Sequence, residues 1–145
     1  MKKIIAKPHY FFFGCIPIFL SIALLGRNST ISIPIFAMQF MLSISSLSLF
    51  WCFLFLLFGL DYLVLHWIER PPKKGLSAIH ILLQIIAIIP FFVAIYFTQT
   101  EDKFADHRFF LNLDFSSILI LSFVVFLLSI FVHILNFLAS LFAKK

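Results

Sequence analysis

Four long stretches without a formal charge alternate with short charged segments along the chain. They cover residues 10–26, 29–60, 75–100 and 115–143. An α-helix rises 1.5 Å per residue, so about 20 apolar residues cross a bilayer core of about 30 Å. Three stretches exceed that length, and the first is close to it. The pattern predicts an all-α fold, a polytopic membrane protein whose four transmembrane helices form a bundle in a single domain, residues 1–145.

Prolines and polar residues set the predicted helix ends. Pro34 suits the first turn of the second helix, where its missing N–H costs nothing, and Pro71 and Pro72 end that helix. Tyr62 and Trp67, near this inner end, suit the membrane interface. The predicted helices cover about 10–26, 33–67, 76–99 and 115–143.

Composition supports a lipid environment. Hydrophobic residues make up 63% of the chain and charged residues 12%, which is far from the composition of soluble domains. The net charge of +5 does not indicate nucleic acid, because the basic residues lie at the chain ends and in short turns, where membrane topology explains them. The lipid bilayer is therefore the predicted partner, with no nucleic acid.

The distribution of Lys and Arg predicts the orientation. One side carries Lys2, Lys3, Lys7, Arg70, Lys73, Lys74, Lys144 and Lys145, and the other carries Arg27, Lys103 and Arg108. The positive-inside rule then places both termini and the 69–75 turn in the cytoplasm, with loops 27–32 and 101–114 outside. The predicted location is the bacterial inner membrane or an equivalent energy-transducing membrane.

Two histidines inside the predicted helices are the candidates for a cofactor. Counted from the inner helix ends, His80 lies roughly 7 Å deep and His133 roughly 15 Å deep. A haem held by two histidines needs both near one level. We therefore favour no cofactor, with each histidine bonded to a neighbouring helix, and keep haem bound by His80 and His133 as the alternative.

Four further polar side chains are intramembrane candidates: Gln39, Asp61, His66 and Gln84. Asp61 lies near an inner helix end, so a carboxylate that snorkels or pairs locally is favoured over a proton relay. His66 lies five positions further on and points to a different side of the helix. Gln39 and the nearby serines are typical of helix–helix contacts.

The sequence contains no complete catalytic constellation. It has no phosphate-binding glycine loop, no nucleophile elbow and no Cys-His cluster, and Cys15 and Cys52 both lie inside apolar runs. Neither cysteine has the spacing of a zinc site or a disulfide framework. The chain is therefore predicted not to be an enzyme.

From Asn28 onward, several short sequence features follow one another in an order that is known from another protein family. An outside turn, Asn28–Ile33, precedes a long helix, an inside loop contains Pro71-Pro72, and the next helix opens with Ile79-His80-Ile81. The outside loop with Phe104-Ala105-Asp106 follows, and a last helix ends in Lys144-Lys145. In this order and orientation the chain resembles the last helices of subunit I of haem-copper respiratory oxidases, such as cytochrome c oxidase.

The chain departs from that family where the family binds haem. Phe36 and Ala37 stand where the family has His-Asp, and Ile44 and Ser46 stand where it has the two haem-ligating histidines. The resemblance therefore implies a degenerate, non-catalytic relative of the respiratory chain.

Three functions follow as hypotheses. The first is an accessory subunit of a respiratory oxidase or electron-transfer complex, in contact with other membrane subunits or with copies of itself. The second is a small haem-binding electron carrier that uses His80 and His133. The third is a transport or channel component, in which several copies surround a path lined by Gln39, the serines and Asp61.

Overall fold

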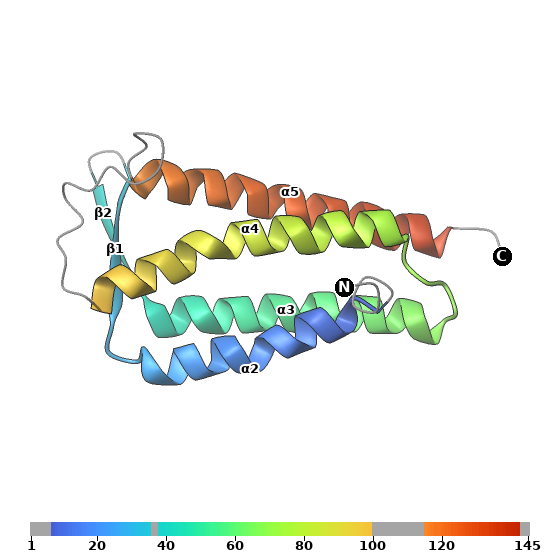
Figure 1. Cartoon of the computed structure of the whole chain (residues 1–145), viewed down its shortest axis with the longest axis horizontal. Coiled ribbons are helices and arrows are strands. Elements are labelled where there is room, and N and C mark those ends of the chain that lie inside the picture. Colours follow the sequence, from blue (N-terminus) through green and yellow to red (C-terminus); the bar gives the residue numbers. More distant parts are fainter. Residues whose placement is uncertain (1–6, 36–37, 100–114, 143–145) are drawn as a thin grey trace.

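The chain forms four α-helices and one β-hairpin within residues 7–35, 38–99 and 115–142, which the computed structural model describes (Figure 1). In chain order the elements are α2 (His9–Leu25), β1 (Thr30–Ile35), β2 (Met38–Ser43), α3 (Ile44–Trp67), α4 (Lys74–Gln99) and α5 (Phe115–Leu141). The predicted helical bundle is confirmed. The hairpin was not predicted.

Three of the helices are long and apolar enough to cross a membrane. Among the described residues the candidate spans are Ile44–Trp67 in α3, Lys74–Val93 in α4 and Ile120–Leu141 in α5. Helix α2 is apolar but has only 17 residues, so it is not among these spans. The membrane class is therefore supported by length and composition, and a fourth crossing by α2 stays a prediction.

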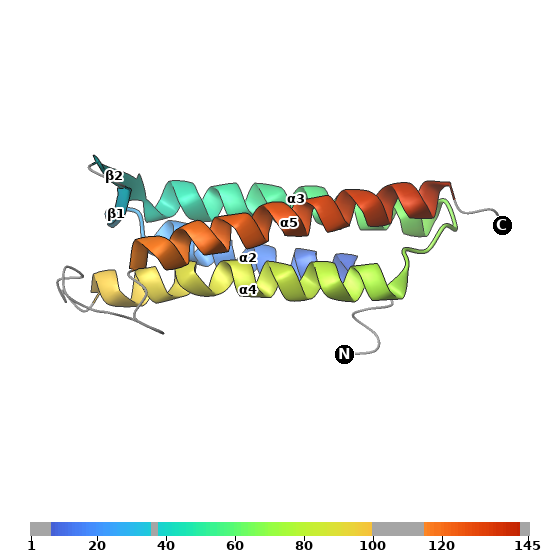
Figure 2. The same ribbon diagram turned by 90° about the horizontal axis from the view of Figure 1, so that it is seen from above.

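The helices pack as two antiparallel pairs. Helix α2 lies along α3, and α4 lies along α5, as the two perpendicular views show (Figure 1, Figure 2). The start of α2, the end of α3, the start of α4 and the end of α5 share one end of the bundle. We call it the basic end, because its described residues include Lys7, Arg70, Lys73 and Lys74. The hairpin lies at the opposite end. This arrangement matches the two sides predicted from the charges.

The predicted start of the second helix was wrong. Residues 33–35 and 38–43 belong to an antiparallel hairpin in which Thr30 pairs with Ser43 and Ile35 with Met38, and α3 begins only at Ile44. The physical reason is local: isoleucine alternates with serine and proline over residues 31–35, and β-branched residues at alternate positions favour a strand. Because the whole stretch is uncharged, its charge pattern does not reveal where the strand ends and the helix begins.

The hairpin belongs outside the hydrocarbon layer. An open two-stranded sheet leaves unpaired N–H and C=O groups along both edges, and lipid cannot bond them. Its base is tied to the bundle by the Ile44 N–H, which donates to the Ser29 carbonyl at 3.0 Å. Phe40 and Met41 are exposed, as suits contact with lipid headgroups. The predicted loop 101–114, with the chain termini, lies outside the described residues.

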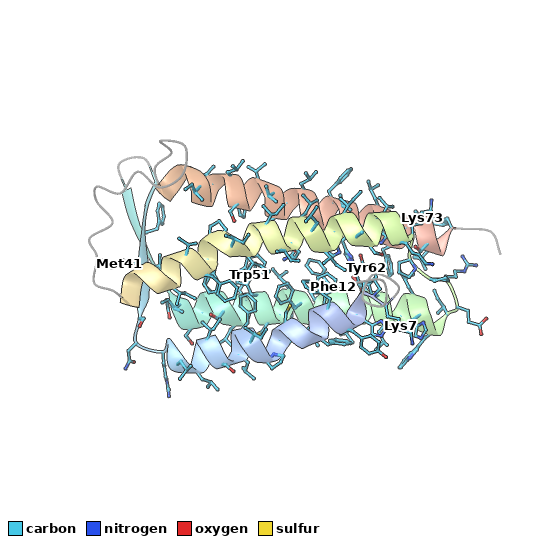
Figure 3. All side chains as sticks on the ribbon, viewed as in Figure 1. Lys7, Phe12, Met41, Trp51, Tyr62 and Lys73 are labelled. Atoms are coloured by element: carbon cyan, nitrogen blue, oxygen red, sulfur yellow. The ribbon has the colours of Figure 1, made fainter. Side chains whose placement is uncertain are left out.

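Aromatic side chains fill the core between the two helix pairs. Phe12 and Phe19 of α2 are buried and contact α3 and α4; the Phe12 ring stacks on Tyr62 at 5.7 Å, and the Phe19 ring stacks on Phe91 at 5.7 Å (Figure 3). At the hairpin side of this core, Trp51 meets Phe126 of α5 edge to face at 5.1 Å. Aromatic rings therefore join all four helices.

Gly59 lets α2 approach α3 closely. A Cβ atom at this position would lie 2.6 Å from Cε1 of Phe13, well inside van der Waals contact. We expect Gly59→Ala to lower the free energy of unfolding in detergent by about 1–3 kcal/mol, because the Phe13 ring must move. Denaturant titration followed by circular dichroism measures this. Gly14→Ala is the matched control, since nothing lies within 4 Å of a Cβ there and no loss is expected. Equal losses in both variants would contradict the close packing.

Candidate functional site

Polar side chains gather inside the bundle toward the basic end, between α3, α4 and α5. We call the following group the polar cluster: Asp61, Tyr62, Ser77, His80, Gln84, Ser129, His133 and Asn136. Its members on α4 and on α5 are spaced three or four residues apart, which places them on one face of each helix. All are buried except Asp61, whose side chain is 47% exposed.

Asn136 connects all three helices. Its Oδ1 accepts a hydrogen bond from the Lys73 N–H at 3.0 Å, and its Nδ2 donates to Ser77 Oγ at 3.0 Å and to the Tyr62 hydroxyl at 3.3 Å. The Lys73 N–H can only donate, so this bond fixes which end of the amide is the oxygen. Tyr62, predicted at the membrane interface, is instead 1% exposed within the core.

Asp61 pairs with a histidine from another helix. Its Oδ2 lies 3.0 Å from Nε2 of His133, and the His133 ring is buried. The carboxylate is thus paired, but not with a residue close to it along the chain as the sequence suggested. Its partner is an intramembrane residue of α5. Neighbours along the chain could not predict this contact, because the two residues are far apart in the sequence.

His80 and His133 lie side by side, so the predicted difference in depth was wrong. Their ring centroids are 4.8 Å apart. Helix α4 begins at Lys74 and α5 ends at Leu141, which puts the two residues about 9 Å and about 12 Å from their helix ends. The assumed helix ends produced the apparent mismatch.

The histidine pair does not fit a haem in this arrangement. The rings pack directly on each other, His133 Nε2 contacts Asp61, and His80 Nδ1 lies 2.9 Å from the Tyr62 hydroxyl. A haem held between them would need the two rings to stand on opposite faces of a macrocycle. The haem alternative therefore requires α4 and α5 to separate at this level. It stays a prediction.

Three buried nitrogens of the polar cluster have no hydrogen-bond partner: His80 Nε2, His133 Nδ1 and Gln84 Nε2. Gln84 is otherwise held by Ser129, whose hydroxyl donates to its Oε1 at 2.7 Å. Buried polar atoms are normally bonded, because leaving one unpaired costs about 1–3 kcal/mol. Two of these nitrogens, His80 Nε2 and His133 Nδ1, belong to rings that pack against each other.

The remaining candidates lie elsewhere. Gln39 is in β2 opposite Pro34, at the far end of the bundle from Asp61, so the structure does not bring together the two ends of the predicted path. His66 is exposed and stacks on His9 of α2, with 5.7 Å between centroids, which agrees with its predicted separation from Asp61.

Four members of the polar cluster were missed by sequence reasoning: Tyr62, Ser77, Ser129 and Asn136. A signal for three of them was present. Ser77, His80 and Gln84 on one helix, and Ser129, His133 and Asn136 on the next, repeat polar residues at helical spacing inside uncharged runs. Two such faces in antiparallel neighbours are expected to meet.

His9 gives the basic end a pH-dependent contact outside the predicted span 10–26. Burial, then the nearby charges of His66 and Lys7, lower the pKa of His9 below 6.5. The folded state therefore favours neutral His9, so its stabilising contribution is complete above about pH 6.5 and is lost as pH falls toward the folded pKa.

We accordingly expect the thermal midpoint to fall by a few degrees between about pH 7.5 and about pH 5.5, measured in detergent micelles. His9→Phe keeps an aromatic ring for the stack and removes the titration, so its midpoint should fall less over the same interval. An identical fall in both proteins would show that His9 has no part in it.

The fold and the polar cluster together define a small helical membrane protein with a hydrogen-bonded interior. Among the described residues, no group of three or more His, Cys, Asp or Glu side chains is arranged to hold a metal ion. Comparisons of the chain with family models, with curated proteins and with solved structures find no match.

Proposed function

We propose that this protein is a non-catalytic subunit of a larger membrane complex. The observation that carries the proposal is the polar cluster, whose side chains bond one another across α3, α4 and α5. Interhelical hydrogen bonds of this kind hold helices together in lipid, where apolar side chains gain little from leaving the surrounding acyl chains. The polar residues thus have a structural use that requires no substrate.

Helix α5 supplies the outer face best suited to a partner. It is the least covered of the three spans, and large side chains such as Phe123, Leu127 and Phe131 are exposed along it. Phe123 and Phe131 are 59% and 58% exposed. A neighbouring transmembrane helix can pack on this face through van der Waals contact, as helices do in membranes.

The resemblance to oxidase subunit I suggests the kind of complex. Pro71 and Pro72 lie between α3 and α4, as the resemblance requires, whereas the turn after Asn28 leads into β1 rather than directly into a helix. Ile44 and Ser46, which replace haem ligands in the comparison, lie in the first turn of α3. We propose a respiratory oxidase or electron-transfer complex as the partner, with this chain as an accessory subunit without haem.

Native purification tests the proposal. A tagged full-length chain, extracted from its own membrane in mild detergent, should migrate on a native gel with a larger complex that carries haem absorbance. Phe123→Ala combined with Phe131→Ala should reduce the co-migrating fraction several-fold. Phe53→Ala is the matched control, because Phe53 is 58% exposed on α3. A chain that migrates alone, or only with copies of itself, would overturn the proposal.

A further inference from the structure

Basic side chains gather where α2 begins and α3 ends. Lys7 lies two residues before α2 (Figure 3), and His66 lies one residue before the end of α3; both are exposed. His9 lies between them: its ring stacks on that of His66 with the centroids 5.7 Å apart, and the charges of His66 and Lys7 both act on it. Lys7 and His66 therefore form one cluster across the contact between α2 and α3.

Basic groups outnumber carboxylates at this end of the bundle. The described residues of the basic end include four Lys or Arg side chains and two carboxylates, those of Asp61 and Glu69. Asp61 already pairs with His133 of α5. An anion bound at Lys7 and His66 would reduce the repulsion among the basic groups around His9.

Two exposed aromatic side chains place this cluster at the membrane interface. Trp67, the last residue of α3, is 76% exposed, and Tyr10, in the first turn of α2, is 61% exposed. The Lys7 ammonium lies 5.8 Å from the centre of the Tyr10 ring. Tyrosine and tryptophan are enriched at the level of lipid headgroups. Lys7 and His66 therefore lie where the phosphates of a bilayer are concentrated.

The outer face of α2 has room for an acyl chain next to the cluster. Gly14 follows Tyr10 by one helical turn toward the bilayer centre, it is exposed, and nothing lies within 4 Å of a Cβ atom built there. One turn further, Ile18 is 53% exposed. Residues four apart lie on the same helix face, so these three positions form one open apolar strip that begins beside Lys7.

We propose that Lys7 and His66 bind the phosphate of one anionic phospholipid, whose acyl chain lies along Tyr10, Gly14 and Ile18. The Lys7 ammonium and a ring N–H of His66 donate to the phosphate oxygens; a neutral imidazole has one N–H, so binding requires no change of protonation. The stack with His9 holds the His66 ring in place. A zwitterionic lipid carries its own cation beside its phosphate, so the basic end attracts it less. The site is independent of any partner subunit.

Quenching of Trp67 fluorescence by brominated lipids tests the proposal. The full chain with Trp51→Phe keeps Trp67 as its one tryptophan. In neutral detergent micelles, brominated phosphatidylglycerol should quench it at a mole fraction about fivefold lower than brominated phosphatidylcholine. Lys7→Gln combined with His66→Phe, which keeps a ring for the stack, should remove this preference. Arg27→Gln is the matched control, because Arg27 is an exposed basic residue at the hairpin end, and it should keep the preference.

Three results would overturn the proposal: equal quenching by the two lipids, a preference that persists in the Lys7 and His66 double variant, or soluble glycerol phosphate that competes as well as the lipid. Circular dichroism shows whether each variant is folded. If the double variant is not, the parent protein decides, because salt screens contacts between exposed charges. A preference that is the same at about 0.05 M and about 0.5 M salt would then contradict the site.

Discussion

Replacing Phe12 by alanine is expected to lower the free energy of unfolding by about 3–5 kcal/mol. The Phe12 side chain is 0% exposed, and its ring contacts those of Phe55, Phe58, Tyr62 and His80 at 5.0–5.9 Å. Its loss leaves a cavity where α2, α3 and α4 meet, and packing contact is the main attraction between helices in lipid. Unfolding in mixed micelles with a denaturing detergent, followed by circular dichroism, measures the change.

Phe53→Ala gives the comparison for this variant. Phe53 is 58% exposed on the outer face of α3, so its removal should change the free energy of unfolding by less than about 1 kcal/mol. Similar losses for the two phenylalanines would mean that α2 does not pack where the structure places it.

Replacing Asn136 by leucine is expected to cost about 2 kcal/mol. The substitution preserves volume but removes three hydrogen bonds, to Lys73 N, Ser77 Oγ and the Tyr62 hydroxyl. Such bonds average about 0.6 kcal/mol each in membrane proteins, and the partners left unpaired add to the loss. The same micelle unfolding assay measures it.

Ser140→Ala serves as the control for Asn136. The Ser140 hydroxyl bonds only the Asn136 carbonyl one turn earlier in the same helix among the contacts described, so its loss should cost less than about 0.5 kcal/mol. A neutral or stabilising Asn136→Leu would show that α4 and α5 associate through apolar packing alone.

The sequence predicted the helices well where charge or proline marks their ends. Helix α2 begins at His9 instead of residue 10, and α3 ends at Trp67 as predicted, because charged residues and paired prolines follow it. The start of α3 was misplaced by 11 positions (residue 33 against Ile44), since no charge separates the hairpin from the helix. Hydropathy alone cannot distinguish an apolar strand from an apolar helix.

The sequence predicted several residues of the candidate site, but it did not predict which of them contact one another. Asp61, His80, Gln84 and His133 were recognised because polar side chains are rare inside apolar helices. Their contacts depend on how far α4 and α5 slide along each other, and an error of two residues at a helix end shifts the level by about 3 Å. Asn136 was not predicted as a site residue because it carries no charge. It nevertheless makes the most cross-helix hydrogen bonds in the polar cluster.

We expect the helical bundle to cross the membrane with its basic end, and hence the polar cluster, on the inner side. Cysteine accessibility in intact cells tests it most directly, after Cys15 and Cys52 are replaced by alanine. A membrane-impermeant maleimide should label Asn28→Cys, at the hairpin end, from outside, and should label Lys74→Cys, at the start of α4, only after the cells are opened. Labelling of both positions from the same side, or recovery of the chain in the soluble fraction, would contradict the account.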